Sequence, residues 1–255
     1  MRNIPLSEVD AIPRAVLAIA TDYPPDTLLP RHAHRRAQFL YAMSGLMEVQ
    51  TDDGAWVIPP YSGVWIPPGK PHQVRMRGAS TRSLYIEPAA RPRAGSACEA
   101  LQVGPLLHQL LLASAEVPAL YQTQGRDALL LDLILLELGS ARRLPLFAPM
   151  PAEPALARLC QALLAKPSIT VRPEAWARAL NMSPRTFSRR FREQTGLAFG
   201  QWRQQACLMA AVTRLAAGDA VTAIALDLGY DSPSAFSSRY RQVLGQSPSS
   251  VRQGL

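Results

Sequence analysis

Short apolar runs separated by turn residues fill the first ninety residues of the chain. The runs AVLAIA (15–20) and LYAMSG (40–45) are followed by others of similar length, and prolines and glycines interrupt the pattern throughout. TDDG at 51–54 lies between two such runs, which predicts a β-hairpin. Because many short strands with regular turns are typical of a β-sandwich or a small barrel, we predict an all-β domain over residues 12–87.

The hydrophobic pattern changes after a linker-like segment at 88–98. Residues 106–117 and 125–143 are rich in leucine and predict two helices with a short connection, which suits an antiparallel hairpin. The pair is more apolar than a small hairpin requires, so it packs either against the β domain or against a second subunit, and the pattern leaves both open. The proline-rich segment 144–154 predicts a second linker.

From residue 154 onward the apolar positions follow a helical period again. Residues 174–196 predict a short helix, a tight turn and a second helix. Ser183 is a good N-cap and Pro184 suits the first helical position, while Gly196 ends the second helix. These signals together predict a helix-turn-helix unit.

The same order of signals returns in residues 220–248. Phe187 and Phe191 anchor the second helix of the first unit, and Phe236 repeats the position of Phe187 after 49 residues. The residues of the second unit that match the caps and anchors of the first are Ser232, Pro233, Phe236, Tyr240 and Gly245. The stretch 198–218 between the units predicts one long helix.

Basic residues are concentrated in this part of the chain. Residues 152–255 hold 13 Arg and Lys against six acidic residues, whereas residues 1–151 hold 14 against 13. Two helix-turn-helix units on one rigid helix predict binding to double-stranded DNA, with the two second helices roughly one turn, or ~34 Å, apart. The predicted DNA contacts lie on the faces that the aromatic anchors leave free: Arg185, Thr186, Ser188, Arg189, Arg192, Ser234, Ser237, Ser238 and Arg241.

The stretches MSPRTFSRRFREQTGLAFGQW and AIALDLGYDSPSAFSSRYRQVLGQSP resemble the DNA-binding domain of the AraC/XylS transcription regulators. The resemblance covers residues 155–252 and implies a seven-helix domain that binds promoter DNA with the second helix of each unit. Cys207 stands where the family usually has arginine, and Ser238 with Arg239 departs from a common pairing. Because the second recognition helix has few long side chains, we expect it to contribute mainly phosphate contacts.

Three of the four histidines lie in two short motifs of the predicted β domain. HAH followed by Gln38, and GVWIPPGKPH ending at His72, resemble the two cupin motifs. The resemblance implies a cupin-like barrel that can bind a divalent metal at one end. Gln38 replaces the usual glutamate, so the site would lack a negative ligand but still suit a borderline metal. The candidate metal ligands are His32, His34, Gln38 and His72, and the alternative is an effector pocket without metal.

The two halves together predict a one-component transcription regulator rather than an enzyme. A small-molecule effector would change the arrangement of subunits and so the way the helices meet DNA. The candidate pocket residues are His32, His34, Gln38, Tyr41, Trp65 and His72. The alternatives are a metal-dependent cupin enzyme fused to a helical domain and an architectural DNA-binding protein without an effector. Arg31, Arg35 and Arg36 are expected to form a solvated face.

The predicted organisation has three parts. Residues 1–98 form the cupin-like sensing domain, residues 99–151 a leucine-rich helical segment with a linker, and residues 152–255 the DNA-binding domain. A homodimer through residues 101–143 is expected. No signal peptide is evident, and the most apolar run (128–139) is short and carries two acidic residues, so we expect a cytoplasmic protein. Three cysteines without a CxxC pair argue against a disulfide framework.

Overall fold

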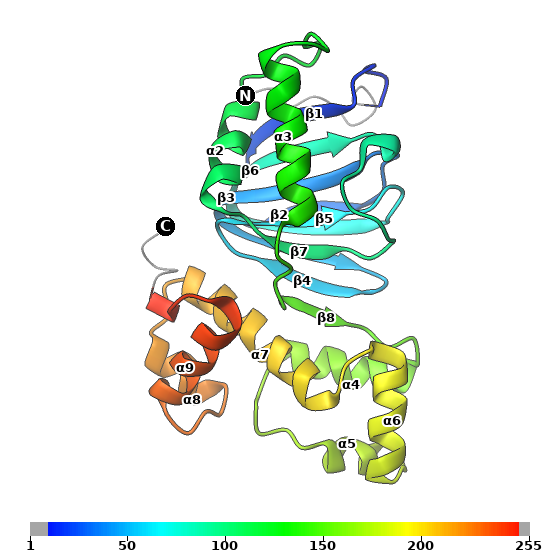
Figure 1. Ribbon diagram of the computed structural model, residues 1–255. Helices are drawn as coiled ribbons and strands as arrows, with labels where there is room; N and C mark the ends of the chain where they lie inside the picture. Colours follow the sequence, from blue (N-terminus) through cyan, green and yellow to red (C-terminus); the bar gives the residue numbers. More distant parts are fainter. Residues whose placement is uncertain (1–9, 250–255) are drawn as a thin grey trace. The chain divides into compact units, whose positions relative to one another are not determined.

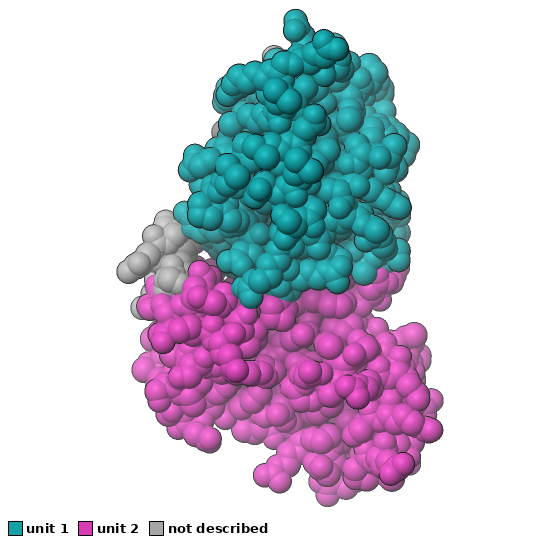
Figure 2. Space-filling view, in the orientation of Figure 1, with its two compact units in different colours: residues 1–51, 58–144 teal, residues 52–57, 145–255 magenta. Residues whose placement is uncertain are grey.

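The structure is a computed structural model that describes residues 10–249 (Figure 1). The chain divides into two compact units, one formed by residues up to 51 with 58–144 and the other by 52–57 with the residues from 145 onward (Figure 2). The first is rich in antiparallel strands and the second in helices, which confirms the predicted fold class. Across residues 10–249, no helix combines the length and apolar character needed to cross a membrane.

The first unit is an antiparallel sheet organised around β6 (His72–Ile86). Strands β1 (Val16–Asp22), β2 (Thr27–His32) and β3 (Ala37–Thr51) pair with β6, β5 (Ser62–Ile66) pairs with β3, and β7 (Glu99–Gln102) pairs with β5. A short 3-10 helix, η1 (Pro88–Ala90), follows β6.

Strand β3 is longer than the hydrophobic pattern predicts, because two apolar runs that flank Gly45 belong to one strand of 15 residues. Gly45 has φ +70°, and the register with β6 shifts beside it. A Cβ atom at this position would lie 2.3 Å from the carbonyl oxygen of Gly78. Glycine therefore lets the strand bend against β6 without ending it.

The helices α2 (Pro105–Ser114) and α3 (Arg126–Ser140) cover one face of this sheet (Figure 1). Their inward leucines share one buried cluster with Phe39, Tyr41 and Trp65 of the strands. The hairpin therefore packs on the β unit, as one of the two alternatives predicted. A second leucine face of α3 stays exposed, however, with Leu129 67%, Leu133 38% and Leu136 71% accessible.

The second unit contains six helices among the described residues: α4 (Pro154–Ala165), α5 (Pro173–Ala179), α6 (Pro184–Thr195), α7 (Phe199–Ala216), α8 (Val221–Asp227) and α9 (Pro233–Leu244). The pairs α5–α6 and α8–α9 are the two helix-turn-helix units, and α7 joins them. Five aromatic residues, Trp176, Phe187, Phe191, Phe199 and Trp202, pack α5, α6 and α7 together.

The segment 144–154 is not a plain linker. It contains β8 (Phe147–Pro149), which pairs with β4 (Gly54–Ile58). The Phe147 ring stacks on Trp56 with 4.3 Å between centroids, and Trp202 Nε1 donates a 2.7 Å hydrogen bond to the Pro149 carbonyl. These contacts fix a proline-rich stretch that composition alone assigns to a linker. The domain ranges 1–98, 99–151 and 152–255 stay a prediction.

Candidate DNA-binding helices and candidate ligand site

Helix α6 begins and ends as the sequence predicts. The Ser183 side chain accepts a hydrogen bond from the Thr186 backbone N–H at 3.2 Å, and Pro184 occupies the first helical position. Gly196 adopts the left-handed conformation at φ +72°. Phe187 and Phe191 are fully buried. The caps and the aromatic anchors therefore determine which face of α6 remains free.

That free face is strongly basic. Arg185, Ser188, Arg189 and Arg192 are exposed, and Thr186 is half-buried with its hydroxyl 2.9 Å from that of Ser183. Arg189 has one distant ion pair on the helix, 3.9 Å from Glu193, which contributes little at such exposure. Arg190 points elsewhere and forms a 2.8 Å ion pair with Glu153. The arginines on the free face are thus available to a polyanion.

Helix α9 has the same cap and anchor positions as α6 but different exposed side chains. Ser232 accepts a 3.1 Å hydrogen bond from the Ala235 N–H, and Gly245 ends the helix at φ +79°. Ser234, Ser238 and Arg241 are exposed, and Ser237 is half-buried. Arg239 donates hydrogen bonds to Gln204 on α7 and to Gln242. All the predicted DNA contacts therefore lie on α6 and α9, although α9 carries fewer charges.

The turns of the two helix-turn-helix units begin with the same backbone conformation and hydrogen bond. Asn181 at φ +52° and Gly229 at φ +79° both follow the first helix of their unit. The next N–H donates back to the helix in each case, from Met182 to Ala177 at 2.8 Å and from Tyr230 to Ala225 at 2.9 Å. This is the hydrogen bond of a Schellman cap. The two turns therefore share this cap despite different residues, although the second has two residues before its N-cap serine, Tyr230 and Asp231, where the first has only Met182.

Cys207, the residue that departs from the family pattern, is fully buried in α7. Burial raises the pKa of its thiol to about 12, so the thiol stays protonated. All three cysteines are buried thiols. Cys207 therefore acts as a small core residue and not as a reactive group.

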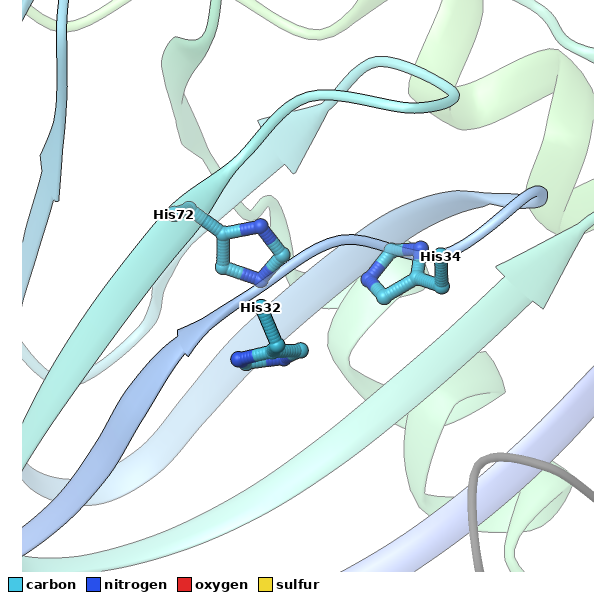
Figure 3. Close-up of side chains that lie close together, drawn as sticks. All are labelled: His32, His34 and His72. Atoms are coloured by element: carbon cyan, nitrogen blue, oxygen red, sulfur yellow. The ribbon is translucent and has the colours of Figure 1, made fainter.

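Three histidines converge at one place in the first unit. His32 ends β2 and is paired in register with His72, the first residue of β6, while His34 follows in the connection to β3. The three rings surround a common space (Figure 3), with centroids 4.4, 5.2 and 6.0 Å apart. One ring nitrogen from each lies within 4.8 Å of the other two. His34 and His72 are buried and His32 is half-buried.

Burial controls the protonation of this group. It lowers the pKa of His34, and it lowers the pKa of His72 to about 4. Both rings are therefore neutral near pH 7. In each neutral ring one nitrogen carries a proton and the other offers a lone pair.

Gln38 lies beside this group as predicted. Its Nε2 lies 2.6 Å from the Ser83 hydroxyl and 3.1 Å from the Tyr85 hydroxyl, and its Oε1 lies 3.1 Å from His34 Nε2. Burial raises the pKa of Tyr85 to about 12, so its phenol keeps the proton. Sequence reasoning missed Ser83 and Tyr85. Their signal was the alternation in RSLYIEP, where polar Ser83 and Tyr85 share one face of an apolar strand.

The structure does not bring Tyr41 and Trp65 to the histidines. Successive residues of a strand point to opposite faces, and Phe39 and Tyr41 face the helical hairpin together with Trp65. The Tyr41 hydroxyl instead pairs with His108 Nδ1 on α2 at 2.6 Å. Four of the six predicted pocket residues therefore lie together: His32, His34, Gln38 and His72.

Arg36 is an exception to the expected solvated face of arginines, because its side chain is fully buried. Its guanidinium donates to the carbonyls of Ile12 and Arg14, both at 2.7 Å, and pairs with Glu87 at 2.7 Å. Exposed Arg35 pairs with the same carboxylate. These bonds hold residues 12–14 beside β3, which the local sequence could not indicate because the acceptors are distant in the chain.

The fold and these sites define a class of protein, a ligand-responsive DNA-binding regulator. A model of the AraC-like ligand binding domain matches residues 15–139, and a model of a helix-turn-helix domain matches residues 176–254. The chain is 31% identical over 220 residues to the HTH-type transcriptional regulator NimR of Escherichia coli K12, covering 86% of this chain and 80% of NimR. The chain therefore belongs to the AraC/XylS family of transcription regulators, as the sequence resemblance predicted.

Solved structures to which the chain is similar include ToxT from Vibrio cholerae O395, at 12% identity and TM-score 0.40, covering 94% of this chain and 98% of ToxT. The DNA-binding domain of AdpA in complex with a target DNA is 33% identical, with TM-score 0.37, and covers 40% of this chain and 92% of that domain.

Proposed function

We propose that this regulator binds promoter DNA through the free faces of α6 and α9, and that α6 contributes most of the base recognition. The observation that supports this is the exposed arginine set of α6, compared with serines at matching places in α9. Arginine can form bidentate contacts with guanine, whereas serine forms single hydrogen bonds. The contact set is that predicted above: Arg185, Thr186, Ser188, Arg189, Arg192, Ser234, Ser237, Ser238 and Arg241.

A footprint on the DNA upstream of the protein's own gene tests this proposal, followed by fluorescence anisotropy on the protected duplex. We expect affinity to fall steeply with salt, because each neutralised phosphate releases counterions. Arg192→Ala should reduce the salt slope by about one if this side chain contacts a phosphate. Arg158→Ala, an exposed arginine on α4, is the matched control and should leave binding unchanged. A salt-independent affinity would contradict the proposal.

The exposed face of α3 supports a homodimer, with the predicted segment 101–143 as its interface. Leu129, Leu133 and Leu136 recur at a helical spacing on one exposed face, and large apolar patches of this kind favour self-association. Leu136→Glu should shift the protein to a monomer in sedimentation equilibrium. Leu120→Glu is the control, because Leu120 is 65% exposed but lies off the helix. An unchanged mass in Leu136→Glu would contradict the interface.

The ligand-binding domain would sense a small effector at His32, His34, Gln38 and His72, and a regulator of chromosomal DNA would act in the cytoplasm. Family membership favours this function over a cupin enzyme. The footprint repeated with and without candidate effectors tests the coupling between the two units.

A further inference from the structure

The three converging histidines share one hydrogen-bond arrangement. Nδ1 of His32 lies 2.7 Å from the Pro30 carbonyl, Nδ1 of His34 lies 2.7 Å from the Arg36 carbonyl, and Nδ1 of His72 lies 2.8 Å from the Lys70 carbonyl. A carbonyl oxygen only accepts, so each Nδ1 carries the proton. In the neutral form of each ring, the lone pair therefore lies on Nε2, directed away from its own backbone partner.

One of these lone pairs has no protein donor within residues 10–249, and a second lies beside the side-chain amide of Gln38. His72 Nε2 is fully buried and has no hydrogen-bond partner among the described residues. His34 Nε2 lies 3.1 Å from Gln38 Oε1, also in a buried place. A buried acceptor without a donor is costly, and a cation would satisfy several such acceptors at once. The backbone carbonyls behind the rings are the outer partners that typically orient metal-bound imidazoles.

From this arrangement we propose that His32, His34 and His72 bind one borderline divalent metal ion through their Nε2 atoms, and that this ion is the effector of the regulator. The second half of the proposal rests on the proposed function. Three neutral imidazoles favour Zn²⁺, Co²⁺, Ni²⁺ or Cu²⁺ over Mg²⁺ and Ca²⁺, which prefer carboxylate and other oxygen ligands. Gln38 Oε1 is placed to contribute a neutral oxygen beside the three nitrogens.

The test is a titration of the full chain after chelator treatment, with Zn²⁺ followed by calorimetry and Co²⁺ by visible absorption. We expect one ion per chain, a Co²⁺ spectrum that reports nitrogen ligation, and no saturable binding of Mg²⁺. Because His32 is half-buried and the least embedded of the three, His32→Ala is the first variant. It should weaken Zn²⁺ binding by more than the roughly 10–100-fold that loss of an outer partner causes.

The fourth histidine supplies a matched control. His108 lies on α2 and pairs with Tyr41, outside the cluster, so His108→Gln should leave Zn²⁺ affinity unchanged. The buried cysteines reduce competition from thiolates. Absence of stoichiometric binding in the unmodified chain would overturn the site, and so would equal losses in His32→Ala and His108→Gln. The measurement on the unmodified chain decides the question even where a variant fails to fold.

DNA binding then separates the two halves of the proposal. We expect the affinity for the protected duplex to change over the same Zn²⁺ range as the calorimetric titration, and His32→Ala to remove the response. Metal binding with no change in DNA affinity would overturn the effector role of the ion, while the assignment of the metal site would stand. Specific DNA binding without metal binding would overturn the site and leave the proposed function. Absence of specific DNA binding would instead contradict the proposed function, whatever the titration shows.

Discussion

The two helix-turn-helix units have nearly the same backbone and very different surfaces. An offset of 49 residues superimposes the signals of their second helices, so that Ser183 matches Ser232 and Gly196 matches Gly245. With the same offset, Arg185 matches Ser234 and Arg189 matches Ser238. The residues that cap and anchor the helices are retained, while those on the free face differ. Folding requirements and the proposed DNA recognition thus fall on separate positions of one helix.

The cores below these helices also differ. The first helix-turn-helix unit packs five aromatic side chains that carry no hydroxyl. The second helix-turn-helix unit contains Phe236 with Tyr230 and Tyr240. The Tyr240 hydroxyl is buried without a hydrogen-bond partner in the described part of the chain. Burial alone raises the pKa of this phenol. This unpaired hydroxyl lowers the folding free energy gained by the second helix-turn-helix unit, and the five aromatic side chains of the first have no such hydroxyl.

The largest expected difference concerns DNA affinity. Arg189→Ala should weaken specific binding by about 1–3 kcal/mol if the side chain reads a base, whereas Ser238→Ala at the matching place should have a much smaller effect. Fluorescence anisotropy on the protected duplex and on an unrelated duplex measures the specific part. Equal losses in the two variants would show that the two helices share recognition evenly.

The turns should differ in their tolerance of a side chain. Gly229→Ala forces a Cβ into the left-handed region, which costs about 1–2 kcal/mol, and that Cβ would meet Thr170 Cγ2 at 2.7 Å. Asn181→Gly at the matching turn keeps the same backbone and should change stability little. Urea unfolding of the full chain measures both. A stability loss in Asn181→Gly as large as in Gly229→Ala would contradict the shared turn geometry.

The N-caps should behave alike in the two units. Ser183→Ala and Ser232→Ala each remove an acceptor for a backbone N–H, which should cost about 1 kcal/mol of unfolding free energy. Thermal unfolding measures the losses, with exposed Ser188→Ala as the control within helix α6. Unequal losses of stability in Ser183→Ala and Ser232→Ala would contradict the expectation that the two N-caps contribute equally.

The smallest expected change has the opposite sign. Tyr240→Phe removes a buried hydroxyl without a partner and should stabilise the second helix-turn-helix unit by up to about 1 kcal/mol. The result would bring its core closer to that of the first unit, where Phe191 occupies the matching place. The measurement is again urea unfolding, and a loss of stability would reveal a hydrogen bond made by this hydroxyl.

Local signals predicted most of the helical unit. Ser183, Pro184 and Gly196 act on backbone groups within a few residues of themselves, and paired aromatics four residues apart define the buried side of a helix. The histidine motifs likewise predicted a cluster, because His32 and His72 pair across two strands. The pattern failed where a segment depends on a distant partner. The proline-rich stretch around Phe147 forms a strand because its backbone pairs with β4 and the Phe147 ring stacks on Trp56.

The sequence by itself determined the caps, the aromatic anchors, the basic free face of α6 and the three histidines, since each depends on residues close in the chain or on a short motif. Only the tertiary structure decided that Tyr41 turns toward the helical hairpin, that Arg36 is buried, and that three backbone carbonyls fix the histidine rings. The physical reason is that the face a strand side chain occupies, and the partner it meets, depend on the layer that covers the sheet, which is supplied from elsewhere in the chain.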